Sequence, residues 1–217
     1  MAGRDIQTDM TAGIPSKIIF NFTVPIFIGN IFQQFYNRAD TVIVGKFVGT
    51  GALAAVGSVG TIVFLIIGFL QGLTAGFSVL TAQRYGAGDM RNMRKSVGTA
   101  CILSVIITIV MTAGSMTAMK SLLSFMNTPE DIFADAYAYI MIICGGIGAT
   151  VLYNLLSGIL RALGDSKTPL YFLVLSAALN IGLDLFFIIV FRMGVAGAAY
   201  ATVISQGVSG VGCLIYI

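Results

Sequence analysis

Long apolar runs recur along the whole chain and restrict its fold more than any other feature. Each run is long enough to cross the roughly 30 Å hydrocarbon core of a bilayer as a helix. In hydrocarbon the backbone must satisfy its own hydrogen bonds, so only helices and closed barrels can span a membrane. The chain has 26 glycines and lacks the alternating ten-residue pattern of barrel strands. The sequence therefore predicts an all-α membrane protein.

Six transmembrane helices are predicted, after a polar cytoplasmic tail of residues 1–14. The first span has no cleavage site and is too long for a signal peptide, so we expect it to be retained. The six helices are expected to form one transmembrane unit over residues 15–217. Their approximate ranges are 15–44, 52–83, 95–119, 130–160, 168–190 and 195–217.

The basic residues predict that the N-terminus is cytoplasmic. Eight Lys and Arg residues fall on the N-terminal side of the six spans and four on the other side. Cytoplasmic loops of membrane proteins carry this excess of positive charge. The inner set is Arg4, Lys17, Arg84, Arg91, Arg94, Lys95, Arg161 and Lys167, and the outer set is Arg38, Lys46, Lys120 and Arg192.

An enzymatic function is not expected. The chain contains no His, which removes the commonest general base and metal ligand. Residues 86–89 match the GxGD motif of intramembrane aspartyl proteases, but Asp89 lies in a basic loop rather than inside a span.

The three cysteines are far apart within apolar runs, which favours buried thiols over a disulfide or metal site. No cofactor is predicted.

Glycine carries two local predictions. Gly68, Gly72 and Gly76 recur at intervals of four, a spacing that favours close packing of transmembrane helices. The segments 84–89 and 161–165 echo one another, and in each we expect a glycine to supply the left-handed turn at a helix end.

A polar stripe interrupts the first apolar run. Gln33, Tyr36, Asn37 and Asp40 fall at i, i+3, i+4 and i+7, which is one face of a helix. A carboxylate inside such a run is costly in hydrocarbon, so it usually faces protein or a wet cavity. This stripe is therefore the first candidate site.

A second carboxylate lies at a similar predicted depth. At 1.5 Å per residue, Asp40, Asp184 and Thr202 lie about 9–12 Å inward from the outer ends of their spans, and Asn180 is one turn from Asp184. Such a group can share a proton or offer hard oxygen ligands to a small cation. The alternative is a polar contact that only holds the helices together, and spacing does not decide between them.

Four segments of the chain together form a recognisable pattern. They are Phe32–Gly45 (FQQFYNRADTVIVG), Gly51–Gly57 (GALAAVG), Gly158–Asp165 (GILRALGD) with Pro169, and Gly194–Ala199 (GVAGAA). These segments resemble the MATE (multidrug and toxic compound extrusion) family of transporters, and the resemblance runs from Asp9 to Gln206. It implies a family fold of twelve helices in two six-helix lobes, of which this chain is the N-terminal one.

The resemblance also implies site residues. The coupling-ion site, for H⁺ or Na⁺, would comprise Asp40, Asn180, Asp184, Thr202 and the carbonyl of Ala198, and Na⁺ would bind at the first four. The implied substrate cavity contains Gln34, Tyr36, Asn37, Tyr139 and Asn154.

The implied function is the efflux of organic cations or drugs in exchange for H⁺ or Na⁺, across the plasma (inner) membrane of a prokaryote. The expected partners are the lipid bilayer, small organic cations and a second six-helix lobe, because the family needs about twice this length; nucleic acid is not expected. Two alternatives are a flippase of lipid-linked sugars from the same superfamily and a non-transporting assembly lobe. A flippase would favour a more basic cavity, whereas Arg38 is the only candidate for a cavity-side cation and the outer interface is the alternative place for it.

Overall fold

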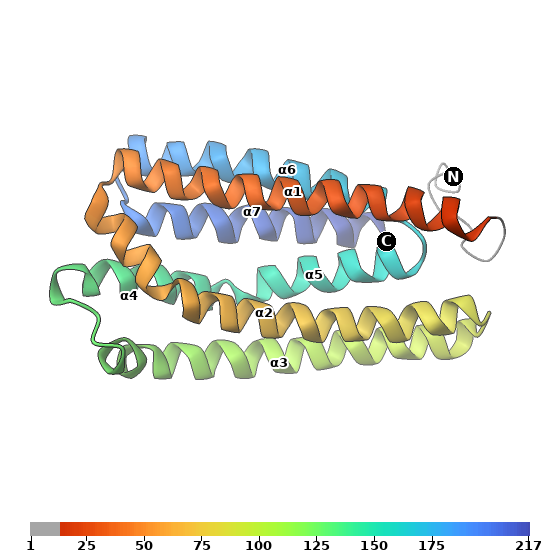
Figure 1. Ribbon diagram of the computed structural model, residues 1–217. Coiled ribbons are helices and arrows are strands. Elements are labelled where there is room, and N and C mark those ends of the chain that lie inside the picture. The colour runs from red at the N-terminus through yellow and green to blue at the C-terminus, as the bar shows by residue number, and fades with distance from the viewer. Residues whose placement is uncertain (1–13) are drawn as a thin grey trace.

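The chain folds as a bundle of long helices (Figure 1). The computed structural model describes residues 14–217, except the side chain of Asn37. The helices are α1 (Pro15–Phe47), α2 (Thr50–Gly86), α3 (Met90–Phe125), α4 (Glu130–Gly145), α5 (Ile147–Ala162), α6 (Lys167–Leu185) and α7 (Val195–Tyr216), and the π-helix η1 (Phe186–Val190) extends α6.

The all-α membrane fold is confirmed. Five helical segments are each long and apolar enough to cross a membrane, and α4 with α5 makes a sixth if this bent pair counts as one span. The pair bends by 44° at a break of one residue, Gly146. Most helices extend beyond the predicted ranges, and the limits of the segments inside the bilayer stay a prediction.

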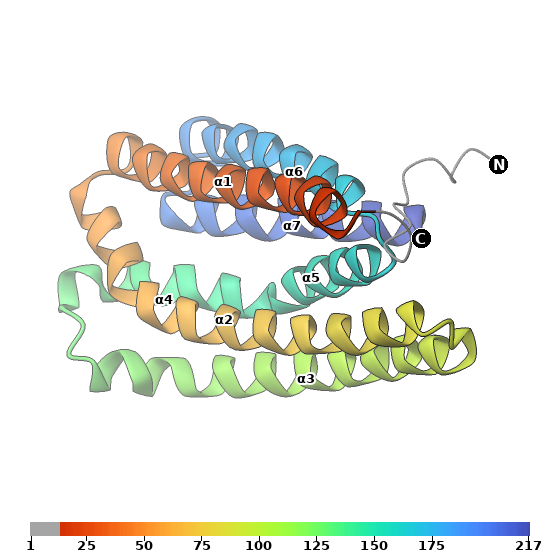
Figure 2. The same ribbon diagram turned by 45° about the vertical axis from the view of Figure 1, so that its right-hand side comes forward.

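The helices form two groups (Figures 1 and 2). The first consists of α1, α6 and α7, which pack on one another, and the second of α2 and α3 with α4. The second half of the bent span joins them, because α5 packs on both α7 and α2. We call the end that carries the start of α1 and the α2–α3 and α5–α6 turns the N-terminal end of the bundle.

Close approach between helices depends on single glycines. A Cβ on Gly158 would collide with the Ser78 hydroxyl of α2, and one on Gly212 would lie 2.8 Å from Phe172 Cδ1 of α6. The predicted packing of Gly68, Gly72 and Gly76 is wrong within the described part of the chain. All three are exposed, and among the described residues no atom outside their own stretch of helix lies within 4 Å of where their Cβ atoms would be.

The two echoing segments form the same kind of turn at the N-terminal end. Gly88 (φ 72°) and Gly164 (φ 90°) take the left-handed conformation, and the aspartate that follows each of them caps the next helix. Asp89 Oδ1 accepts from Asn92 N at 3.1 Å, and Asp165 Oδ1 accepts from Thr168 N at 2.9 Å. These aspartates therefore stabilise helix ends. Elsewhere in the bundle, all three cysteines are free thiols.

Candidate functional site

Asp40 and Asp184 face one another where α1 packs on α6. Their carboxyl groups interact directly, and Asp184 is completely buried. No described group donates a hydrogen bond to Asp40 Oδ1 or to either carboxyl oxygen of Asp184. Two carboxylates only accept hydrogen bonds, so a bond between them needs a proton on one of the two.

Asn180 and Thr202 extend this acid pair toward α7. Asn180 Nδ2 donates to Thr202 Oγ1 at 3.3 Å, while Asn180 Oδ1 is buried and has no hydrogen-bond partner among the described residues. Ala198 lies one turn before Thr202 on α7 and is completely buried. We call Asp40, Asn180, Asp184, Ala198 and Thr202 the acid cluster. Its members come from three helices whose packing sets their common depth.

Two tyrosines and a glutamine border the acid cluster. Gln206 Nε2 of α7 donates to the Tyr36 hydroxyl at 3.4 Å, and Tyr36 is also hydrogen-bonded to Gln33. Tyr139 of α4 is buried within electrostatic range of both acids. Gln206 Oε1 is a further buried oxygen to which no side chain or backbone group in the described part of the chain donates.

The chemistry of this region suits a proton or a small hard cation. Its unpartnered oxygens come from carboxylate and carboxamide groups, which are the ligands that hard cations prefer. Within the described residues, no three His, Cys, Asp or Glu side chains gather as they would around a metal ion. A π-helix begins at Phe186, two residues after Asp184, and the carbonyl of Phe186 accepts from Phe191 N at 3.2 Å. Such irregular turns are frequent at functional sites.

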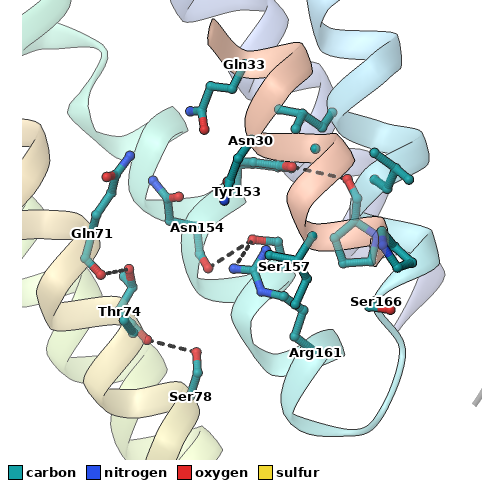
Figure 3. Close-up of a pocket in the computed structure, with 17 residues that line it drawn as sticks. Asn30, Gln33, Gln71, Thr74, Ser78, Tyr153, Asn154, Ser157, Arg161 and Ser166 are labelled. Atoms are coloured by element: carbon teal, nitrogen blue, oxygen red, sulfur yellow. Dashed lines mark hydrogen bonds between the residues drawn. The ribbon is translucent and has the colours of Figure 1, made fainter. Parts of the chain in front are cut away.

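A separate pocket of about 360 Å³ lies between α1, α2, α5 and the start of α6. Figure 3 shows Asn154, Ser157 and Arg161 of α5 across from Gln71, Thr74 and Ser78 of α2. The other lining residues are Pro25, Ile26, Gly29, Asn30, Gln33, Ala75, Tyr153, Ser166, Pro169, Leu170 and Leu173.

The predicted cavity residues separate into different places. Asn154 lines the pocket, whereas Tyr36 and Tyr139 lie beside the acid cluster. Gln34 lines a second hollow of about 320 Å³ on α1, together with Arg38. Asn37 was also predicted, but its side chain lies outside the described part of the structure.

Asn154 is the one residue of the predicted cavity that lines this pocket, and the missed lining residues include Arg161 and Gln71. Arg161 lines the pocket, although its sequence position suggested a loop after the fourth span, and Gln71 lines it from α2. The available signal was the spacing of Asn154, Ser157 and Arg161, which recur at three and four residues along one helix face. Arg161 Nη2 donates to Ser157 Oγ at 3.3 Å, as this spacing allows.

Comparison with known proteins places the chain among transporters. The MatE family model matches residues 25–186. The probable multidrug resistance protein YpnP of Bacillus subtilis is 36% identical over 96% of this chain and 47% of its own length. The probable multidrug resistance protein NorM of Thermotoga maritima is 28% identical over 93% of this chain and 44% of its own.

Solved structures agree with the sequence matches. A MOP superfamily transporter from Pyrococcus furiosus has a TM-score of 0.91 and 33% identity, over 97% of this chain and 47% of that one. An outward-facing multidrug resistance MATE family transporter matches with the same TM-score, identity and coverage. The chain thus spans about half the length of these relatives. On the strength of the family match over residues 25–186 and the fold shared with these solved structures, this chain belongs to the MatE family of multidrug transporters.

Proposed function

We propose that this chain forms one lobe of a cation-coupled multidrug antiporter, with the acid cluster as the coupling-ion site. The observation that carries the proposal is the set of buried, unpartnered oxygens on Asp40, Asn180 and Asp184, where three helices meet. A polar contact that only held helices together would pair its donors with its acceptors. Acceptors left without donors instead suit a proton or Na⁺.

The coupling between ion binding and the conformational change follows from the charge of the acid pair. With H⁺ or Na⁺ bound, the acid pair carries less negative charge than without it, and the helices around it can pack more closely. A bound ion shifts the balance between outward- and inward-open states only through different affinities for the two. The cargo would be an organic cation or drug that moves without chemical change, as the names of the curated relatives suggest.

A second six-helix lobe is the proposed partner, because the chain covers 47% of YpnP. We further propose that the assembly lies in the plasma membrane of a prokaryote, with the N-terminal end of the bundle facing the cytoplasm. The charge distribution supports this orientation, since cytoplasmic loops carry the excess of Lys and Arg.

The first test is ion-dependent thermal stability of the purified chain in detergent. We compare Na⁺ with choline over a pH series for the chain, Asp40→Asn, Asp184→Asn and the double variant. A shared site predicts that either substitution removes the response to Na⁺ and pH, and that the double variant loses little more. Asp135→Asn is the control, because Asp135 is exposed on α4.

Additive losses with an unchanged ion response would refute the shared site and leave a packing role. Transport itself is tested by counterflow of an organic cation in proteoliposomes, with the chain alone and with a partner lobe. Counterflow that needs the partner lobe and an intact Asp40 supports the antiporter. Ion-dependent stability without counterflow in either setting would point to a lobe that binds the ion but does not transport.

A further inference from the structure

Arg161 places a positive charge inside the pocket. It lies in the last turn of α5, and its side chain lines the space between α5 and α2 (Figure 3). A guanidinium group carries five N–H donors in a rigid fork. Only one donated bond to a described side chain forms, from Nη2 to Ser157 Oγ at 3.3 Å. Most of its donor capacity therefore remains for a ligand.

No carboxylate among the described residues neutralises this charge. The pocket lining contains no Asp and no Glu. The acid nearest in sequence, Asp165, uses Oδ1 to accept from Lys167 N at 3.1 Å and Thr168 N at 2.9 Å. The electrostatic partners of Arg161 are Tyr153 and Cys213, which carry no formal charge at neutral pH. An unpaired charge away from water is costly, so a counter-charge from a ligand is favoured.

The rest of the lining is neutral and of two kinds. Thr74 and Ser78 donate to carbonyls of their own helix, so the further donors that line the pocket include the amide groups of Asn30, Gln33 and Gln71 and the hydroxyl of Ser166. Another part of the lining is apolar. It consists of Pro25, Ile26, Pro169, Leu170 and Leu173. The pocket thus offers one guanidinium group, a few polar groups and an apolar surface that suits the non-polar part of a ligand.

We propose that this pocket binds the carboxylate or phosphate group of an organic anion, with Arg161 as the anion-binding residue. Both groups match a guanidinium fork in a bidentate geometry. The volume of about 360 Å³ is within the range of small-molecule sites. The proposal does not rest on ion coupling, because Arg161 lies outside the acid cluster and the two sites can be tested separately.

A purely structural role for Arg161 makes a different prediction. A cation in the last turn of a helix interacts favourably with the helix dipole, and lysine serves that role as well as arginine. Lysine does not reproduce the bidentate fork. Arg161→Lys therefore retains the structural role and weakens anion binding, which separates the two explanations.

The experiment is a titration of the purified chain in neutral detergent with inorganic phosphate and with benzoate. Chloride at equal ionic strength is the control. Thermal unfolding is followed with and without each anion. At ten times its Kd, a ligand multiplies the ratio of folded to unfolded chain about 11-fold. We expect a saturable rise in Tm with phosphate or benzoate that is reduced in Arg161→Lys and absent in Arg161→Gln. Arg91→Gln should keep it, because Arg91 is exposed at the start of α3.

A second measurement needs no substitution and covers a variant that fails to fold. Phenylglyoxal modifies arginines, and mass spectrometry gives the rate at each one. Bound anion should slow modification of Arg161 saturably and leave Arg91 unchanged. The same measurement in nanodiscs of phosphatidylglycerol and of phosphatidylcholine identifies the source of the anion.

Protection by free phosphate or benzoate supports a soluble anion. Protection by phosphatidylglycerol alone supports the same site occupied by a lipid headgroup. Equal modification of Arg161 under all conditions, or a Tm rise that persists in Arg161→Gln, would overturn the proposal.

Discussion

Replacing Gly146 with alanine tests whether the bend of the fourth span depends on close contact with α7. Gly146 separates α4 from α5, and its φ of −87° and ψ of 3° are open to alanine. An added Cβ would nevertheless lie 2.7 Å from Val203 Cγ1 and 3.0 Å from Val203 Cβ, and closer still to Cγ2. The substitution therefore changes packing without straining the backbone.

The size of the effect follows from this geometry. Carbon atoms in contact lie about 3.5–4.0 Å apart, so Val203 or α7 must move by about 1 Å. Valine has little freedom at χ1, and overpacking of this kind costs about 1–3 kcal/mol. Alanine in place of glycine recovers up to about 1 kcal/mol of helix propensity. The expected net loss is about 1–2 kcal/mol, or roughly 2–8 °C in Tm for a chain of this size.

The assay is thermal unfolding in detergent with a fluorogenic thiol reagent, since Cys144 and Cys213 are buried and become reactive when the chain unfolds. Gly145→Ala is the matched control, because Gly145 is exposed and a Cβ there would meet no atom within 4 Å. Val203→Ala removes the methyl groups that collide. The double variant should therefore be more stable than the sum of the two single losses predicts. If Gly146→Ala is as stable as Gly145→Ala, or if the two losses simply add, the packing argument is wrong.

Three further predictions concern the turns between helices. Asp165→Ala should cost about 1–2 kcal/mol, because it removes a helix cap, and Asp165→Asn should cost less in the same thermal assay. The pKa of Asp89 is lowered by hydrogen bonds from the Asn92 side chain and backbone, so its charge contributes stability above the unfolded value of about 3.9. The Tm difference between the unchanged chain and Asp89→Asn should become smaller as the pH falls below that value. A Tm difference that is the same at every pH would contradict this role of the Asp89 charge. In whole cells, an impermeant thiol reagent should label Ser124→Cys and not Ala87→Cys, and the reverse would invert the proposed orientation.

The sequence was sufficient for most of the helices and for placing Asp40, Asp184 and Thr202 at one level of the bundle. A helix rises by a fixed distance per residue, so counting from charged ends brought Asp40, Asp184 and Thr202 to one level. Their lateral contact depends on the packing of α1 on α6 and of α6 on α7, which no count along the chain contains. The hydrogen bond from Asn180 to Thr202 is a product of that packing.

The pocket and the helix contacts were harder to predict, for two physical reasons. The 44° bend beside Gly146 lies in the middle of an apolar run, where the sequence gives no sign of it. The predicted span therefore ended before Arg161, which was assigned to a loop, although it lies on α5 and lines the pocket. Glycine spacing also indicates where another helix can approach the backbone closely, but it does not indicate which helix does so. Gly158 and Gly212 meet bulky or polar neighbours from other helices, whereas Gly72 meets nothing.

One face of α1 connects the two candidate sites. Gln33 lines the pocket, Tyr36 is hydrogen-bonded to Gln33 and Gln206, and Asp40 belongs to the acid cluster. These residues are separated by one or two turns of a single helix, which shifts or rotates as a unit. A ligand in the pocket and an ion between Asp40 and Asp184 would therefore both act on the position of α1. Thermodynamic linkage makes such an effect reciprocal, so an ion that changes the affinity for the pocket's ligand must itself bind with a changed affinity when that ligand is present.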